Sequence, residues 1–288
     1  VAGGTQGCLD RAVIRARGLS KAYGKSRALD SVDFDVEAGR IVGLIGPNGA
    51  GKTTALKAIL GLTDFSGELS VLGLDPRTQR TELMQQVCFI ADVAVLPRWL
   101  RVGEAIEYVE GVHPRFSRQA CEAFLAKTKL KPNMRVKELS KGMVVQLHLA
   151  LVMAIDAKLL VLDEPTLGLD ILYRKEFYQN LLNEYFDHGK TILVTTHQVE
   201  EIEHILTDLL IIKDGRIALA ATMDDVGERF TEVMVGPDLR EQALALKPLH
   251  ERSVFGKSVF LFDGPAREQL AALGELHKPS VADIFVAM

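Results

Sequence analysis

The chain has 288 residues, of which 48% are hydrophobic and 25% charged, and its formal net charge is −4. This composition is typical of a globular protein, and the slight acidity excludes a general attraction to nucleic acid or to an anionic membrane. The three cysteines, Cys8, Cys88 and Cys121, have no C-x-x-C spacing, so we expect a reducing compartment rather than a disulfide framework. The sequence contains neither a run of about 18 apolar residues nor the apolar core of a signal peptide, so we expect a cytoplasmic protein.

Two alternating segments precede the first unbroken apolar segment. Residues 12–16 alternate like an edge strand, and residues 28–36 place Val32, Phe34 and Val36 on one face. Residues 40–45 are almost wholly apolar, which predicts a buried strand. Two alternating strands before a buried one indicate a small antiparallel layer beside a parallel core.

A glycine-rich loop with the sequence GPNGAGKTT follows this strand at residues 46–54 and leads into a helical segment. The pattern G-x-x-x-x-G-K-[ST] between a strand and a helix is the phosphate-binding P-loop. Its glycines let successive backbone N–H groups point into one concavity. Lys52 carries the charge for the outer phosphates, and the Thr53 hydroxyl is placed to hold Mg²⁺. The residues expected to bind nucleotide in this loop are Asn48, Gly49, Ala50, Gly51, Lys52, Thr53 and Thr54.

Strands and helices alternate through much of the remaining chain. Short strands are expected at residues 67–73 and 87–90, buried strands at residues 158–165 and 191–196, and a hairpin at residues 208–220. Residues from about 93 to 156 have apolar residues at helical spacing and predict a helical insert. This order predicts an α/β fold with a parallel P-loop NTPase core, an antiparallel β layer and the helical insert.

Two domains are expected from this pattern. Residues 11–225 would form the nucleotide-binding domain, and residues 226–288 a small α+β C-terminal extension. Residues 224–229 have the character of a connector between them. Within the extension, residues 265–273 have the pattern of a helix.

Polar residues follow two of the buried strands. Asp163 and Glu164 end one strand, where a carboxylate must face a cation or water. Asp163 is placed to hold Mg²⁺ through water, and Glu164 to polarise an attacking water as general base. His197 ends the next strand, at the edge where open parallel sheets bind ligands, which favours contact with a phosphate. A solvated strand end and a structural histidine are the alternatives for these residues.

Two further sites are ambiguous when each is taken alone. Ser140 precedes an apolar helix, so it is expected to cap that helix, whose N-terminus would be a second anion site. Such a residue is more often only a helix start. Tyr23 lies in a turn-rich segment and, alone, would be most simply a surface aromatic.

Together these motifs resemble the ATP-binding subunits of ABC transporters, over residues 13–220. Residues 46–54 resemble the family's Walker A loop, and residues 159–164 its Walker B strand with the catalytic glutamate, Glu164. Residues 139–143 are similar to the signature motif, and residues 166–170 to the D-loop, which ends in Asp170. His197 matches the switch histidine, and Tyr23 the aromatic residue that stacks on adenine.

The resemblance implies a particular assembly and chemistry. Two nucleotide-binding subunits, as a homodimer or a heterodimer, would pair head to tail, with each ATP between one Walker A loop and the partner's signature residues Ser140, Lys141 and Gly142. Asp170 would link the two sites, with ATP and Mg²⁺ as the cofactors. A transmembrane permease would be the other partner and would hold the chain on the inner face of the cell membrane; nucleic acid is not expected as a partner.

The sequence departs from the family at two positions around the phosphates. A glutamine that reaches Mg²⁺ usually ends the strand before the helical insert, whereas this chain has Ala91 and Asp92 there. Asp92 is therefore a candidate metal ligand, and a solvated loop acid is the alternative. In the signature, Lys141 replaces the first glycine and Met143 the glutamine, a form that resembles ABC-2 type exporter-like subunits in bacteria.

We therefore expect an ATPase subunit that powers an ABC transporter through ATP-driven dimerisation. Two alternatives remain open. One is a soluble, non-transport ABC ATPase, which usually has two nucleotide domains or long coiled-coil inserts. The other is an ATP-clamp or regulatory ABC protein with low turnover, which the altered Asp92 and signature positions allow.

Overall fold

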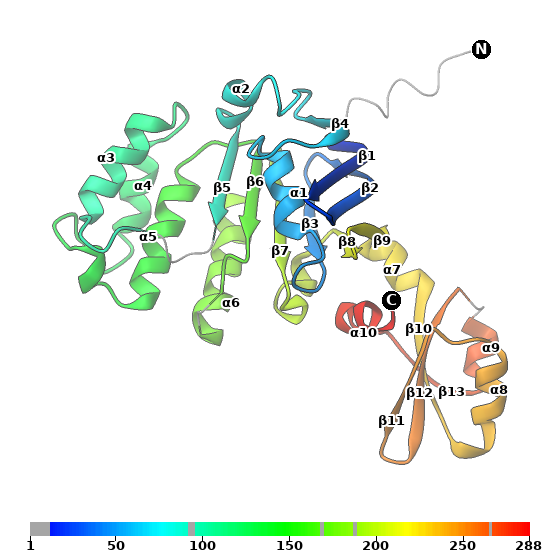
Figure 1. Ribbon diagram of the computed structural model, residues 1–288. Helices are drawn as coiled ribbons and strands as arrows, with labels where there is room; N and C mark the ends of the chain where they lie inside the picture. Colours follow the sequence, from blue (N-terminus) through cyan, green and yellow to red (C-terminus); the bar gives the residue numbers. More distant parts are fainter. Residues whose placement is uncertain (1–11, 92–95, 168–169, 187–188, 265–266) are drawn as a thin grey trace, which may run out of the picture.

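The computed structural model describes residues 12–91, 96–167, 170–186, 189–264 and 267–288. Within these residues the strands form three sheets of six, three and four strands. Figure 1 shows the first two sheets in one larger unit, with the third in a smaller unit at the C-terminal end. No helix in the described ranges is both long and apolar enough to cross a membrane.

The six-stranded sheet is the core of the larger unit, with the strand order β5-β6-β7-β3-β8-β9. Its first four pairs are parallel, and β8 and β9 form an antiparallel hairpin. Nearly every residue of β3, β6 and β7 is buried, as their unbroken apolar runs predict for strands covered on both faces. The strands are β3 Ile41–Ile45, β5 Val87–Ala91, β6 Leu159–Asp163, β7 Thr191–Thr196, β8 Asp208–Lys213 and β9 Arg216–Thr222.

The antiparallel layer has the strand order β2-β1-β4, with β1 at Ala12–Tyr23, β2 at Ser26–Glu37 and β4 at Ser66–Val71. The expectation of an edge strand at residues 12–16 is wrong, because β1 is the central strand and pairs with both neighbours. Its second partner, β4, comes from beyond the P-loop helix, so the local sequence carries no sign of the pairing. Helix α1 (Lys52–Ile59) buries Leu56 and Ile59 in the core between the two sheets.

Helices form the insert at one end of the sheet, at the left of Figure 1. Helix α5 is apolar on all sides, which suits a helix that is buried on two faces. Leu147 and Leu151 pack with α3 and α4, whereas Val145 and Leu149 join the core cluster on the central sheet. The remaining helices of the larger unit are α2 Arg80–Met84, α3 Val102–Val112, α4 Arg118–Leu125, α5 Lys141–Met153 and α6 Ile171–Asn180.

The smaller unit is an antiparallel sheet with the order β11-β12-β10-β13 and helices α8 and α9 beside it. Val233, Phe260 and Phe262 form its own core with Leu270. Its elements are β10 Phe230–Val235, α8 Arg240–Ala245, β11 His250–Val254, β12 Lys257–Asp263, α9 Arg267–Ala271, β13 Gly274–His277 and α10 Val281–Ala287.

The expected connector at residues 224–229 is instead helix α7 (Met223–Arg229). Thr222 and Asp225 cap each other's backbone N–H groups at its start, which supports a helix in a short polar segment. Helix α7 spans the expected boundary between residues 225 and 226, and the domain limits remain a proposal.

Candidate functional site

The glycine-rich loop at residues 46–54 joins β3 to α1, and close contacts with neighbouring strands fix its shape. Gly51 has φ 113°, and a Cβ there would lie 2.4 Å from the carbonyl oxygen of Ala28 in β2. A Cβ on Gly46 would lie 2.3 Å from the carbonyl oxygen of Ile212 in β8. The Ala50 carbonyl accepts a hydrogen bond of 3.0 Å from the Gly215 N–H. The loop therefore needs glycine at both close approaches.

Lys52 lies beneath this loop and is only 7% exposed. Its ammonium donates hydrogen bonds to the carbonyl oxygens of Gly46 (2.6 Å) and Pro47 (3.3 Å). Burial lowers the pKa of Lys52, whereas the charges of Glu164 and Asp163 raise it. The ammonium of Lys52 is thus held under the loop by two carbonyl oxygens. A phosphate oxygen would be a stronger acceptor for it, because it is charged.

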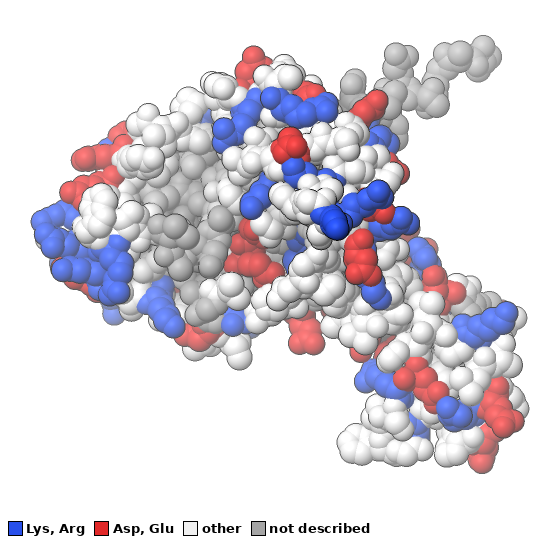
Figure 2. All heavy atoms as spheres, in the orientation of Figure 1, with Lys and Arg blue, Asp and Glu red and all other residues white. Residues whose placement is uncertain are grey.

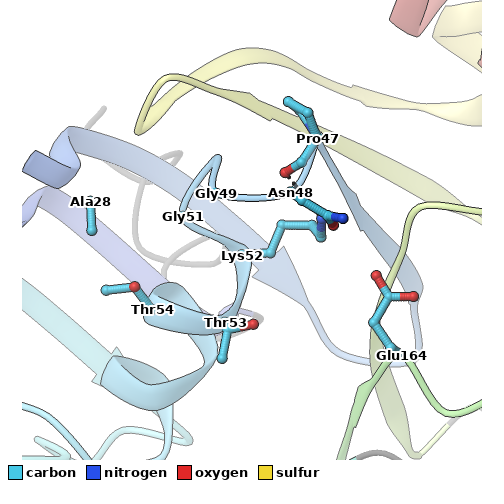
Figure 3. A pocket seen from close by; sticks show the side chains of 9 residues that line it. All are labelled: Ala28, Pro47, Asn48, Gly49, Gly51, Lys52, Thr53, Thr54 and Glu164. Atoms are coloured by element: carbon cyan, nitrogen blue, oxygen red, sulfur yellow. Dashed lines mark hydrogen bonds between the residues drawn. The ribbon is translucent and has the colours of Figure 1, made fainter. Parts of the chain in front are cut away.

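One pocket joins the loop to the end of β6. Figure 3 shows Lys52 and the Glu164 carboxylate facing this pocket from different elements. Thr53 and Thr54 lie in the first turn of α1, and Thr53 is exposed. The residues that line the pocket are Ala28, Pro47, Asn48, Gly49, Gly51, Lys52, Thr53, Thr54 and Glu164.

The acidic end of β6 is held by the neighbouring strand β7. Asp163 accepts a hydrogen bond of 2.6 Å from the Thr195 hydroxyl, and the Glu164 N–H donates to the Thr195 carbonyl oxygen (3.1 Å). Glu164 has φ 47°, uncommon for this residue type, so the chain turns directly after Asp163 and the two side chains leave the strand differently. Its carboxylate lies 2.9 Å from Nδ1 of His197. The structure therefore brings Glu164 and His197 together.

The oxygen atoms at this edge fit a small hard cation. Thr53 is exposed, and one carboxylate oxygen of Asp163 accepts the hydrogen bond from Thr195. The described residues hold no group of three or more His, Cys, Asp or Glu side chains that would bind a metal ion by themselves. Such a set suits Mg²⁺, which keeps several waters and takes further oxygens from a phosphate ligand. Asp92 lies outside the described residues.

The expected signature residues lie at the N-terminus of α5. Ser140 caps the helix, its hydroxyl accepting a hydrogen bond of 3.2 Å from the Met143 N–H. Ser140 and Lys141 are exposed, whereas Gly142 is buried under the ring of Tyr173. None of the three lines the pocket of the same chain.

Asp170 lies at the start of α6, and Tyr23 at the end of β1. Asp170 caps α6 by accepting hydrogen bonds from the N–H groups of Leu172 (3.1 Å) and Tyr173 (3.2 Å). Tyr23 ends β1 and is 50% exposed. Hydrogen bonding to Thr63, and to a smaller extent to Thr54, lowers the pKa of Tyr23. Its ring is thus beside the pocket, through Thr54, although it does not line it.

Two residues of the site, Thr195 and Ala28, are not predicted by any of the sequence motifs. Thr195 contacts both Asp163 and Glu164, and it is a fully buried polar residue in an apolar strand, which is a detectable signal. Ala28 lines the pocket from β2, and no feature of the sequence singles it out.

Comparison with known proteins identifies the family of the chain. The ABC transporter family model matches residues 29–167. The chain is 32% identical over 302 residues to Nod factor export ATP-binding protein I of Rhizobium johnstonii, covering 98% of this chain and 96% of that protein. It is 35% identical over 299 residues to the protein of the same name from Burkholderia lata, covering 96% and 97% of the two chains.

Solved structures share the fold. An ATP-binding subunit of an ABC transporter superposes with a TM-score of 0.65 at 27% identity, covering 75% of this chain and 92% of that chain. A nucleotide-free ATP-binding cassette from an ABC transporter, at 20% identity, superposes with a TM-score of 0.63 and covers 73% and 91%. From its near full-length relatives and its site, the chain belongs to the ATP-binding subunits of ABC transporters, and it is an ABC transporter ATPase.

Proposed function

We propose that the chain binds Mg·ATP in the pocket of Figure 3 and hydrolyses it there to drive an exporter. The observation that carries this proposal is the pairing of Glu164 with His197 across the pocket from Lys52. Lys52 and the loop residues 48–54 bind the phosphates, and Tyr23 stacks on the adenine. Glu164 activates the attacking water as general base, and His197 holds the γ-phosphate in position.

Mg²⁺ is proposed to bind at the oxygen groups at the edge of the pocket. The Thr53 hydroxyl would be a direct ligand, and Asp163 would act through a water molecule. Asp92 is the third proposed ligand and stands in for the glutamine of other family members. When bound, the ion would neutralise charge on the phosphates during hydrolysis.

We propose that a second copy of the chain completes each site. Ser140, Lys141 and the Gly142 backbone of one copy would face the ATP on the other copy. The exposure of Ser140 and Lys141 at a helix N-terminus supports this arrangement. Ile171 and Leu172, next to Asp170, are 78% and 79% exposed, as expected of apolar side chains that a partner covers. Asp170 would connect the two sites.

Export is the direction that the relatives favour, because their names state Nod factor export. As an ATP-binding subunit, the chain would bind a permease on the inner face of the cell membrane. Nucleic acid is not proposed as a partner. Figure 2 shows both signs of charge mixed over the face drawn, apart from a basic group at the end where α3 and α4 lie, and the net charge is −4.

Light scattering of the Glu164→Gln variant tests the dimer. Because this variant would bind ATP without hydrolysing it, Mg·ATP should raise its mass to twice the 31.6 kDa of the chain, whereas ADP should not. Ser140→Ala in the same background should weaken this dimer and leave ATP binding to the monomer intact. A mass that stays at 31.6 kDa with ATP bound would refute pairing between copies. Co-purification of a polytopic membrane protein with the chain from membranes tests the permease partner.

A further inference from the structure

The segment that follows β7 carries His197 and has little regular structure of its own. After His197 the chain makes two short 3₁₀ turns, Val199–Glu201 and Glu203–Ile205, before it enters β8. Short 3₁₀ turns have few internal hydrogen bonds. Val199, Ile202 and Ile205 are its buried side chains, so their tertiary contacts fix where the segment lies.

The C-terminal helix α10 supplies part of these contacts. Val281 and Ile284 of α10 are fully buried in the core cluster that contains Val199, Ile202 and Ile205. Figure 1 shows α10 returning from the small sheet to the larger unit. Although α10 is the last helix of the C-terminal extension, its apolar face is therefore part of the core of the nucleotide-binding unit.

Polar contacts fix both ends of α10 on that unit. The Val281 N–H donates a hydrogen bond of 3.1 Å to the carboxylate of Glu203, which lies six residues after His197. At the other end, the Lys213 ammonium donates to the carbonyl oxygen of Met288 (2.7 Å). A hydrogen bond to a charged acceptor is stronger than one to a neutral acceptor. The bond from Val281 to Glu203 therefore fixes the position of α10 against the segment.

Residues 198 and 201 of the same segment are hydrogen-bonded to α6. Arg174 donates hydrogen bonds to the side chains of Gln198 and Glu201. Asp170, the residue proposed to link the two ATP sites, is the N-cap of α6. The segment is therefore held between α6 and α10, one leading to the dimer interface and the other to the C-terminal extension.

We infer that Glu203 and α10 are positioning groups for His197, so that the C-terminal extension controls hydrolysis through the segment of residues 197–205. This inference rests on the proposed role of His197. Arg252 of β11 also contacts the carboxylates of Glu232 in β10 (3.1 Å) and Asp283 in α10 (3.9 Å), so ion pairs connect the small sheet to α10. A shift of the extension would therefore reach His197 through α10.

Replacement of Glu203 tests the hydrogen bond between this residue and α10. Glu203→Ala removes the acceptor of the Val281 N–H, and kcat should fall about tenfold, the change that one charge-assisted hydrogen bond can account for. Affinity for a fluorescent ATP analogue should stay within about twofold, because the pocket lining is untouched. Glu203→Gln keeps an acceptor oxygen and should restore most of kcat. Glu200→Ala, an exposed neighbour in the same segment, is the matched control and should match wild type.

A double-mutant cycle with His197→Ala separates positioning from general loss of stability. If Glu203 acts through His197, Glu203→Ala should lower kcat little further in the His197→Ala background. Single-turnover measurements would resolve the slow rates of that background. Equal fold losses in both backgrounds, or no loss from Glu203→Ala in wild type, would overturn the inference.

The failure of the proposed function would look different, because His197→Ala by itself would then leave kcat unchanged. Urea unfolding shows whether each variant is folded. If Glu203→Ala does not fold, Ile284→Val makes a smaller change in the α10 contact, and the same cycle applies to it.

Discussion

Replacing Gly51 with alanine should destabilise the protein more than replacing Gly49, although both glycines lie in the same loop. Both have positive φ, 83° at Gly49 and 113° at Gly51. They differ in the space around a new Cβ. At Gly49 no heavy atom lies within 4 Å, whereas at Gly51 the Ala28 carbonyl oxygen lies at 2.4 Å and a methyl of Leu29 at 3.0 Å.

The expected magnitudes follow from these contacts. A left-handed backbone costs an alanine roughly 1–2 kcal/mol, which applies to both positions. Overpacking against a close neighbour adds about 1–3 kcal/mol, and at Gly51 the close neighbour is backbone, which cannot rotate away. The lower entropy of alanine in the unfolded chain is the same in both variants and cancels in the comparison. Gly51→Ala should therefore be less stable than Gly49→Ala by about 1–3 kcal/mol.

Urea unfolding of the two variants without nucleotide measures this difference directly. Wild type is the reference, and the m-value shows whether each native state stays equally compact. Equal midpoints and m-values for the two variants would refute the argument that the Ala28 carbonyl requires glycine at position 51. A more stable Gly51→Ala variant would refute it more strongly.

Three further predictions concern other parts of the molecule. A Cβ on Gly142 would lie 2.1 Å from the Tyr173 ring, so Gly142→Ala should lower the free energy of unfolding by about 1–3 kcal/mol. Because Tyr173→Ala removes this clash, it should lower the free energy of unfolding less in the Gly142→Ala background than in wild type. Additive effects in urea unfolding would contradict this. Burial lowers the pKa of His148 from 6.5 to about 4, so the unfolded chain binds the proton at a higher pH than the folded chain. The free energy of unfolding should therefore drop by about 3 kcal/mol as the pH falls from 6.5 to 4. His148→Gln should lose this part of the pH dependence. If the profiles of His148→Gln and wild type were parallel, the buried imidazole would not be the cause. Asp92→Ala should lower Mg²⁺-dependent ATPase activity, and an unchanged rate would favour a solvated loop acid.

The sequence was sufficient for elements whose signal is local. The apolar runs of β3, β6 and β7 have lengths and flanking turns typical of buried strands, and these strands are where they were expected. The P-loop residues are contiguous, so their common position in one pocket follows from a single motif. The pairing of Glu164 with His197 needed one further step, because both follow strands that proved to be neighbours.

Long-range pairing was not predictable in the same way. The central place of β1 depends on β4, which lies more than 40 residues later in the chain. The contact of α10 with the segment after His197 joins residues 203 and 281, and neither residue has a pattern that names the other. The helix at residues 223–229 has a polar sequence, and its capping residues, Thr222 and Asp225, were the signal that the sequence reasoning passed over.

The most direct test of the account is the ATPase rate of the Glu164→Gln variant, measured together with its affinity for ATP. The variant keeps the shape of the side chain and loses the base that faces the pocket. The rate should fall about 10²–10⁴-fold, the contribution of a well-placed general base, while ATP binding and the activity of the control Glu200→Gln stay near wild type. A Glu164→Gln variant that hydrolyses ATP at the wild-type rate would contradict the assignment of the pocket as the catalytic site.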